Sequence, residues 1–306
     1  MANESKNIIL GKEKVIQKQQ VKQSFTQWLW SWIKTIVQAL VLVMFINGLL
    51  VANFVVPTGS MENEVMTGDF LCVNRFIFGG STPQTLPFFN TQLPFYKFPG
   101  IRDPKKGDVI VFIFPGMREQ VKADEFQYYL KRCVATAGDS LEVRNKKVFI
   151  NGVEQAVPKN AVFIDGQSDP DDKMRTFPEG AGFTKDNWGP VRIPKKGDVI
   201  ELTKDNYSMW RVFIMREGHK VEIDGSGLVI DGKSINKYTV TRDYVFGMGD
   251  NRDNSLDSRY WGFIPLENIV GTPLFVYWSW DTNMPFGQMA EKIKTIRWGR
   301  IFNGVN

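Results

Sequence analysis

One serine and one lysine suggest the chemistry of this chain. Ser60 lies in the segment PTGSM, residues 57–61, four residues after an uncharged stretch of 22 residues, 35–56. A serine becomes a strong nucleophile when a neighbouring base takes its proton, and that base is most often histidine. The only histidine, His219, lies in the polar stretch REGHK, which is typical of a solvated loop. The base must therefore be another amine or a carboxylate.

Lys131 is the best candidate for that base. It lies in QYYLKRCVATAGD, residues 127–139, and on a strand it would share one face with Tyr129, Cys133 and Ala135. A lysine with an ordinary pKa is neutral only about once in 2,500 at pH 7. Apolar burial that lowers the pKa to about 8 makes roughly one in eleven neutral, at a cost of about 3 kcal/mol. The alternative is a stem that crosses the sheet while its ammonium reaches water.

The third chemical segment is GDNRDNSLDSRYWG, residues 249–262. Its acidic residues first suggest a metal loop, but the calcium-loop spacing fails. Counted from Asp250, Arg252 occupies position three, Ser255 replaces the turn glycine and Trp261 stands where the bidentate glutamate belongs. The sequence therefore predicts no metal site. The Asp and Arg residues are expected to pair with each other, which leaves the serine hydroxyls to support a neighbouring group.

Residues 35–56 predict a membrane-spanning helix. They contain no ionisable residue, and a helix of this length matches the hydrocarbon core of a bilayer, about 30 Å thick. Residues 1–34 carry six lysines and two glutamates, which predicts a cytoplasmic N-terminus. A cleavable signal peptide would have a shorter basic region and a small-x-small site, and a buried core helix is usually shorter. We therefore expect an uncleaved signal anchor.

The remaining 250 residues predict a mainly β fold. They carry 32 basic and 31 acidic residues, so the sequence gives no sign of the basic face that nucleic-acid binding needs. The heptapeptide PKKGDVI occurs at 104–110 and again at 194–200, and we interpret it as a reused turn that opens a strand. Residues 287–302 could form a basic helix that caps the domain or lies on lipid. Short β-branched or aromatic runs bounded by Gly, Pro or Asp occur at 108–114, 140–143, 147–150 and 238–242.

Taken together, these segments resemble the type I signal peptidases, bacterial membrane-anchored proteases that use a Ser-Lys dyad. The segments that carry the resemblance follow the family's order: the anchor, PTGSM (57–61), KKGDVIVF (105–112), YLKRCVATAGD (129–139) and GDNRDNSLDSR (249–259). The chain departs from the usual pattern at 62–64, Glu-Asn-Glu, and at 135–137, Ala-Thr-Ala. Neither departure touches a catalytic group.

The resemblance implies a role for each matching residue. Ser60 is the nucleophile and Lys131 the general base, and Ser255 bonds and orients the Lys131 amine. The Ser60 backbone N–H and the Thr58 hydroxyl form the oxyanion hole. Two structural ion pairs shape the site, Asp257 with Arg259 and Arg132 with Asp250.

The resemblance also implies the organisation and setting of the chain. The catalytic domain is an antiparallel β-sheet fold with an apolar surface near the bilayer and pockets for small residues at the cleavage site. The expected setting is the cytoplasmic membrane of a bacterium, with the catalytic domain outside the cytoplasm. The substrates are secretory preproteins, and no cofactor is expected. The predicted divisions are a basic tail (1–34), the anchor (35–56), a catalytic β core (57–139 and 241–285), an inserted β-rich subdomain (140–240) and a C-terminal basic helix or cap (286–306).

Three other functions fit some of these features. A self-cleaving Ser-Lys repressor would carry a DNA-binding domain in place of an anchor. A maturation peptidase of the same family would cut a narrower set of substrates. A non-catalytic, membrane-anchored β-domain that binds partners requires Ser60, Lys131 and Ser255 to coincide by accident.

Overall fold

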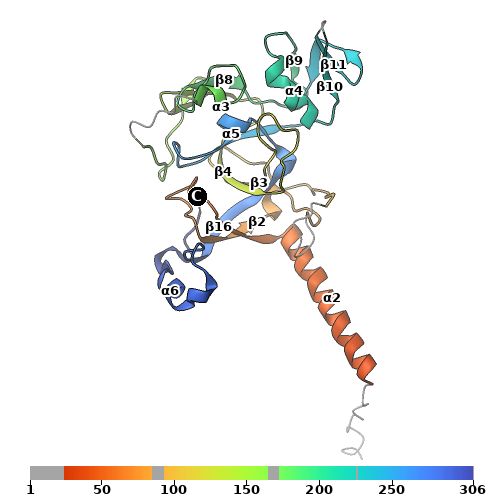
Figure 1. Cartoon of the computed structure of the whole chain (residues 1–306), viewed down its shortest axis with the longest axis vertical. Coiled ribbons are helices and arrows are strands. Elements are labelled where there is room, and N and C mark those ends of the chain that lie inside the picture. The colour runs from red at the N-terminus through yellow and green to blue at the C-terminus, as the bar shows by residue number, and fades with distance from the viewer. Residues whose placement is uncertain (1–23, 85–92, 165–171, 225–226, 306) are drawn as a thin grey trace, which may run out of the picture. The chain divides into compact units, whose positions relative to one another are not determined.

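The N-terminal apolar sequence forms one long helix, α2, Phe25–Leu49 (Figure 1). The computed structural model describes residues 24–84, 93–164, 172–224 and 227–305. Within these ranges α2 is the one helix long and apolar enough to cross a membrane, and none of its most apolar 18-residue window is buried. Of the predicted basic tail, 1–34, residues 1–23 lie outside the described part of the chain.

The helix ends earlier than the apolar composition suggests. The predicted span, 35–56, is helical only as far as Leu49, and Val51–Val55 forms strand β1, which pairs with β2. Arg75 bonds to free carbonyl groups at the end of the helix. Its Nη1 donates to the Asn47 backbone carbonyl (3.0 Å), and its backbone N–H donates to the Leu50 carbonyl (2.9 Å). The residues before and after this boundary are equally apolar, so the hydropathy of the sequence does not show where the helix ends and the strand begins.

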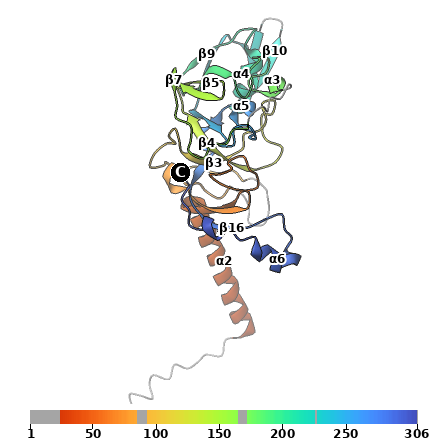
Figure 2. The same ribbon diagram turned by 90° about the vertical axis from the view of Figure 1, so that its left-hand side faces the viewer.

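The central element is a seven-stranded antiparallel sheet with the order β1-β2-β16-β3-β4-β14-β15. Strands β2, β16, β3 and β4 are neighbours in that order, and β3, β4 and β16 are labelled in both views (Figures 1 and 2). The sheet takes its strands from residues 51–135 and 244–279, which confirms a mainly antiparallel β fold. Besides β1, its strands are β2 Asp69–Asn74, β3 Val109–Ile113, β4 Tyr128–Ala135, β14 Tyr244–Met248, β15 Ile264–Pro265 and β16 Ile269–Ser279.

The described residues between β4 and β14 form three smaller sheets and two helices. The sheets have the orders β7-β6-β5-β8, β10-β11-β12 and β13-β9. Their elements are β5 Ser140–Arg144, β6 Lys147–Ile150, β7 Val153–Glu154, α3 Asp172–Arg175, β8 Trp188–Arg192, β9 Val199–Glu201, α4 Tyr207–Arg216, β10 Val221–Asp224, β11 Gly227–Ile230, β12 Lys233–Ser234 and β13 Lys237–Thr239. The short helices and 3₁₀ turns of the rest of the fold are η2 Phe76–Phe78, α5 Ser258–Trp261, η3 Leu266–Asn268, η4 Phe286–Gln288, α6 Met289–Lys294 and η5 Trp298–Arg300.

These inserted strands share a hydrophobic core with β14. Trp188 of β8 is fully buried, and its ring centroid lies 4.7 Å from that of Phe246 in β14. Leu141, Ile214 and Phe263 belong to the same buried cluster. Residues 45–306 form one compact unit. The division of this unit into a catalytic core and an inserted subdomain stays a prediction.

The repeated PKKGDVI heptapeptide builds the same turn twice, as the sequence suggests. In each copy the aspartate side chain accepts a hydrogen bond from the backbone N–H of the lysine three residues earlier. It also forms a bidentate ion pair with the arginine six residues earlier. The residues are Lys105, Asp108 and Arg102 in the first copy, and Lys195, Asp198 and Arg192 in the second. The glycine has a positive φ in both copies, 97° at Gly107 and 88° at Gly197, and the strands β3 and β9 begin two residues later.

The C-terminal residues form a shorter helix than expected. Helix α6 covers only Met289–Lys294 of the stretch 287–302. The helix stops before residues 297–300, where two arginine side chains turn back toward β2: Arg300 Nη2 lies 2.6 Å and Arg297 Nη1 3.7 Å from the buried Asp69 carboxylate. The segment therefore packs on β2 through the two arginines that pair with Asp69.

Candidate active site

Ser60 lies in a tight loop that connects β1 to β2. The loop closes on itself through the Gly68 N–H, which donates to the Val56 carbonyl (2.9 Å). Residues of the 249–259 segment hold the loop from the other side: the Asn251 N–H donates to the Ser60 carbonyl (3.1 Å), and Asn251 Nδ2 donates to the Gly59 carbonyl (3.2 Å). The serine backbone is therefore fixed by a segment almost two hundred residues away in the sequence.

Lys131 reaches Ser60 from the middle of the sheet. Strand β4 lies between β3 and β14, and the Lys131 side chain is only 3% exposed. Its Nζ atom donates a hydrogen bond to Ser60 Oγ at 2.6 Å. Burial lowers the pKa of Lys131 to about 8, and this effect outweighs the attraction of the Asp257 carboxylate, which raises the pKa. The alternative, an ammonium that reaches water, is wrong.

The apolar surroundings of Lys131 follow from strand geometry. Cys133, two residues along the strand, is fully buried, and the Tyr129 ring centroid lies 5.8 Å from Lys131 Nζ. The Tyr129 ring in turn stacks on Phe114, with centroids 4.3 Å apart. Both cysteines, Cys72 and Cys133, are free thiols. The lysine amine is therefore covered on this side by side chains that offer it no counter-charge.

Two glycines make room for the pair. A Cβ on Gly247 would stand 3.1 Å from the Cβ of Lys131. A Cβ on Gly249 would stand 2.5 Å from the Ser60 carbonyl oxygen and closer still to Ser255 Oγ. Real side chains do not approach so closely, so any side chain at position 249 forces the segments that carry Ser60 and Ser255 apart.

Two fully formed ion pairs lie beside the dyad. Arg259 donates to Asp257 at 2.9 and 2.8 Å, and Arg132 donates to Asp250 at 2.8 and 2.6 Å. Burial alone would raise the pKa of Asp257, but Arg259 lowers it below its usual value. All four side chains are buried, and these predicted pairs are present in the structure.

Thr58 and Ser255 differ in how closely they approach the dyad. Thr58 Oγ1 lies 3.5 Å from Ser60 Oγ. Ser255 Oγ is buried and has no hydrogen-bond partner within the described parts of the chain, so the predicted bond to Lys131 is not formed here. His219 bonds to Asp231 instead (Nδ1–Oδ2 2.7 Å), in keeping with its expected place in a polar loop. Among the residues described, no cluster of His, Cys, Asp and Glu could hold a metal ion.

Comparison with known proteins identifies the family of this chain. The model of the family described as signal peptidase, peptidase S26, matches residues 29–278. The chain belongs to the signal peptidase family. It is therefore a serine peptidase, of a family that removes signal peptides, and the non-catalytic alternative is wrong.

Individual signal peptidases match most of the chain. Signal peptidase I of Helicobacter pylori strain 26695 is 30% identical over 290 residues, which cover 90% of this chain and 91% of the relative. Signal peptidase I of Pseudomonas aeruginosa is 28% identical over 82% of this chain and 75% of the relative. A crystal structure of a signal peptidase I from Enterococcus faecalis aligns with 56% of this chain and 97% of its own at 19% identity. Its TM-score of 0.27 is too low to compare the folds.

Sequence reasoning about this signal peptidase missed Asn251, Gly247 and Gly249. Asn251 holds the Ser60 loop through two hydrogen bonds, and the glycines leave space for Lys131 and Ser255. The sequence places Asn251 and Gly249 inside a block rich in polar residues. Their contacts depend on which segment the block faces, and the local pattern does not contain that information.

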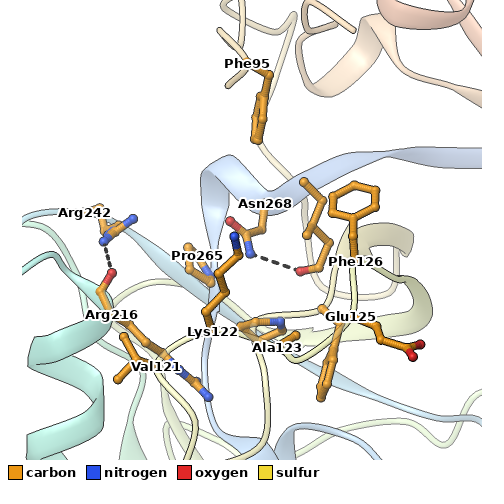
Figure 3. A pocket seen from close by; sticks show the side chains of 13 residues that line it. Phe95, Val121, Lys122, Ala123, Glu125, Phe126, Arg216, Arg242, Pro265 and Asn268 are labelled. Carbon is orange, nitrogen blue, oxygen red and sulfur yellow. Dashed lines mark hydrogen bonds between the residues drawn. The ribbon is translucent and has the colours of Figure 1, made fainter. Parts of the chain in front are cut away.

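A separate cavity of about 300 Å³ opens beside Ile113 at the end of β3 (Figure 3). Neither Ser60 nor Lys131 lines it. Asn268 Nδ2 donates to the Ile113 carbonyl (3.0 Å), and Arg242 Nη2 donates to the Arg216 carbonyl (2.6 Å), as the dashed lines in Figure 3 mark. The Arg216 guanidinium itself donates to the carbonyls of Gly116, Met117, Gln120 and Trp261. Both arginines that line this cavity, Arg216 and Arg242, thus already donate to backbone carbonyls of the protein.

We predict that Gly249→Ala lowers the rate of peptide cleavage by about 100-fold. The added methyl group would displace the Ser60 carbonyl, and a shift of about 1 Å near reacting groups costs on the order of 100-fold. The measurement is kcat/KM for a peptide substrate, and circular dichroism monitors the fold. Gly287→Ala is the matched control, because a Cβ there meets open space. Equal loss of activity in both variants would contradict the steric explanation.

We also predict that Lys131→Met stabilises the protein near neutral pH. The unfolded lysine binds its proton more tightly, with a pKa of 10.5 against about 8 when folded, so burial of the amine costs stability below pH 8. This cost is about 3 kcal/mol, and it disappears as the pH rises from 8 to 10.5. The measurement is the free energy of unfolding of both proteins from pH 7 to 11. A difference that stays constant over this range would refute the linkage.

Proposed function

We propose that this chain is a membrane-anchored serine endopeptidase that removes N-terminal signal peptides from exported preproteins through a Ser60–Lys131 dyad. The observation that carries the proposal is the 2.6 Å distance between Lys131 Nζ and Ser60 Oγ, with the amine almost completely buried. A buried lysine with a pKa of about 8 is neutral in roughly one molecule in eleven at pH 7, which is enough for a general base.

The reaction divides into acylation and deacylation. Ser60 Oγ attacks the scissile carbonyl while its proton moves to neutral Lys131 Nζ. The resulting ammonium gives this proton to the leaving amine, which departs as the new N-terminus of the mature protein. Water then attacks the Ser60 ester, with Lys131 again as the base, and the signal peptide leaves with a free carboxylate.

The developing oxyanion needs donors that are already oriented. We assign this role to the Ser60 backbone N–H and the Thr58 hydroxyl, whose oxygen lies 3.5 Å from Ser60 Oγ. We assign to Ser255 the role of a hydrogen-bond partner that orients the Lys131 amine. Support comes from its buried and unpartnered Oγ in the described part of the chain, next to Gly249, since a buried hydroxyl without a partner costs free energy. The two ion pairs keep the adjoining carboxylates charged and fixed.

The setting is a bacterial cytoplasmic membrane. We infer that α2 anchors the protein, with the basic tail in the cytoplasm and residues 57–306 outside. A signal peptide presents its cleavage site just beyond its own apolar segment. Because β1 begins two residues after α2 ends and Ser60 follows it closely, the nucleophile lies near the same boundary. Anchoring both partners in one bilayer raises their effective concentration. Pockets that accept small residues at the cleavage site are part of this proposal.

A maturation peptidase with narrower substrates is the second candidate. It would use the same dyad and anchor, so the two differ only in substrate range. Cleavage of a panel of preproteins with unrelated signal peptides separates them. Processing of only one member would favour the narrow enzyme.

We expect Ser60→Ala and Lys131→Met each to lower preprotein cleavage by at least about four orders of magnitude, because nucleophile and base act as one unit. The assay uses full-length protein in a non-ionic detergent with a purified preprotein. His219→Ala is the matched control and should retain full activity, since His219 bonds to Asp231 and not to the dyad. Retained cleavage in either dyad variant would refute the mechanism.

The rate should also rise with pH. Only the neutral amine of Lys131 accepts a proton, so kcat/KM is expected to increase about 50-fold between pH 6 and pH 8 and to level off above pH 9. Lys97 is the matched control, because burial lowers its pKa to about 8 as well, and it donates to the carbonyls of Leu266 and Ile269. Lys97→Met should keep the shape of this profile. A profile that is flat from pH 6 to 8 would count against a lysine base.

A further inference from the structure

A cationic cavity of about 210 Å³ lies beside β4, and neither Ser60 nor Lys131 lines it. It is bounded by β4, by the turn before β3 and by residues 155–158, which follow β7. Lys106, Arg132, Lys146 and Arg252 line it, and none of the described residues that line it is acidic. Such a concentration of positive charge requires compensation from carboxylates behind the wall or from a bound anion.

Three of the four cations have a carboxylate partner outside the cavity wall. Each forms an ion pair with an aspartate that does not line the cavity. The pairs are Lys106–Asp139 (3.3 Å), Arg132–Asp250 (2.6 Å) and Lys146–Asp253 (3.0 Å). Asp253 also pairs with Lys185 (2.8 Å), and Arg132 has Glu64 as a second partner (3.6 Å), so these three cations and Lys185 have four carboxylates between them.

Arg252 is the exception. Its side chain is 5% exposed, its Nε atom has no hydrogen-bond partner, and it forms no ion pair with any described residue. The ring of Phe163 lies 6.0 Å from its guanidinium carbon. Burial, followed by the neighbouring Arg259, lowers the pKa of Arg252 to about 10, so it remains protonated at neutral pH. The cavity thus contains one buried positive charge without a direct ion-pair partner among the described residues, although the more distant Asp250 and Asp257 carboxylates attract it.

We propose that this cavity binds a small organic carboxylate, held by Arg252. One missing negative charge matches a monoanion, and the planar guanidinium matches a carboxylate in geometry. The remaining wall is apolar and includes Val134, Val148 and Pro158. An apolar body attached to the carboxylate would cover these side chains, whereas an inorganic phosphate would place polar oxygens against them.

Arg216, in the cavity shown in Figure 3, provides a contrast. There the Arg216 guanidinium donates to four backbone carbonyls, so it offers little to a ligand. Arg252 makes no such bond through Nε. The cavity volume suits a ligand smaller than a typical drug, such as a carboxylate on a short aliphatic or aromatic group.

Calorimetric titration of the full chain with benzoate, in a non-ionic detergent, tests the proposal independently of cleavage. We expect benzoate to bind more tightly than acetate or inorganic phosphate. Arg252→Gln should weaken benzoate binding at least about tenfold, and Lys106→Gln, at the more exposed edge, by a few fold. Arg211→Gln, an exposed arginine of α4, is the matched control and should leave the affinity unchanged.

Three outcomes would overturn the proposal. One is the absence of benzoate binding up to about 10 mM. The second is equal affinity in the wild type and Arg252→Gln. The third is tighter binding of phosphate than of benzoate, which would exclude a carboxylate with an apolar body. If circular dichroism shows that Arg252→Gln does not fold, Lys106→Gln decides, and unchanged affinity in that variant overturns the proposal.

Discussion

Burial of one amine beside one hydroxyl is the constraint on which this structure depends. The Lys131 ammonium is costly in the interior of a sheet, and its neutral form is the one that accepts the Ser60 proton. The surroundings lower that pKa by excluding water, with Tyr129 and Cys133 along the same strand. The same exclusion destabilises the fold below pH 8. The burial of Lys131 therefore both prepares the amine for catalysis and lowers the stability of the fold.

Charge near the dyad is arranged so that it does not reverse this effect. Asp257 lies close enough to raise the pKa of Lys131, but Arg259 engages both of its oxygens. Without Arg259, the buried Asp257 carboxylate would keep its attraction for Lys131 and lose its ion-pair partner. The ion pair thus protects the neutral amine by occupying the carboxylate.

Much of the fold and part of the site follow from the sequence. The period of two around Lys131 predicts its strand and its buried face, and the PKKGD segments predict the same turn twice, but the ion pairs of these turns with Arg102 and Arg192 were not predicted. The end of α2 was not predictable from composition, because the apolar run continues through β1. The contacts of Asn251 also required the fold, since an amide next to Asp250 gives no sign of a loop far away in the chain. The predicted bond from Ser255 to Lys131 is not formed in this structure, and the supporting role of Ser255 stays a proposal.

The core that β8 shares with β14 limits how far this protein can be treated as a set of modules. Trp188 packs on Phe246, which belongs to a strand directly beside the one that carries Lys131. Excision of residues 140–240 would therefore strip apolar cover from the sheet that supports the active site. Any shortened version of this enzyme must first supply a replacement for the Trp188 indole.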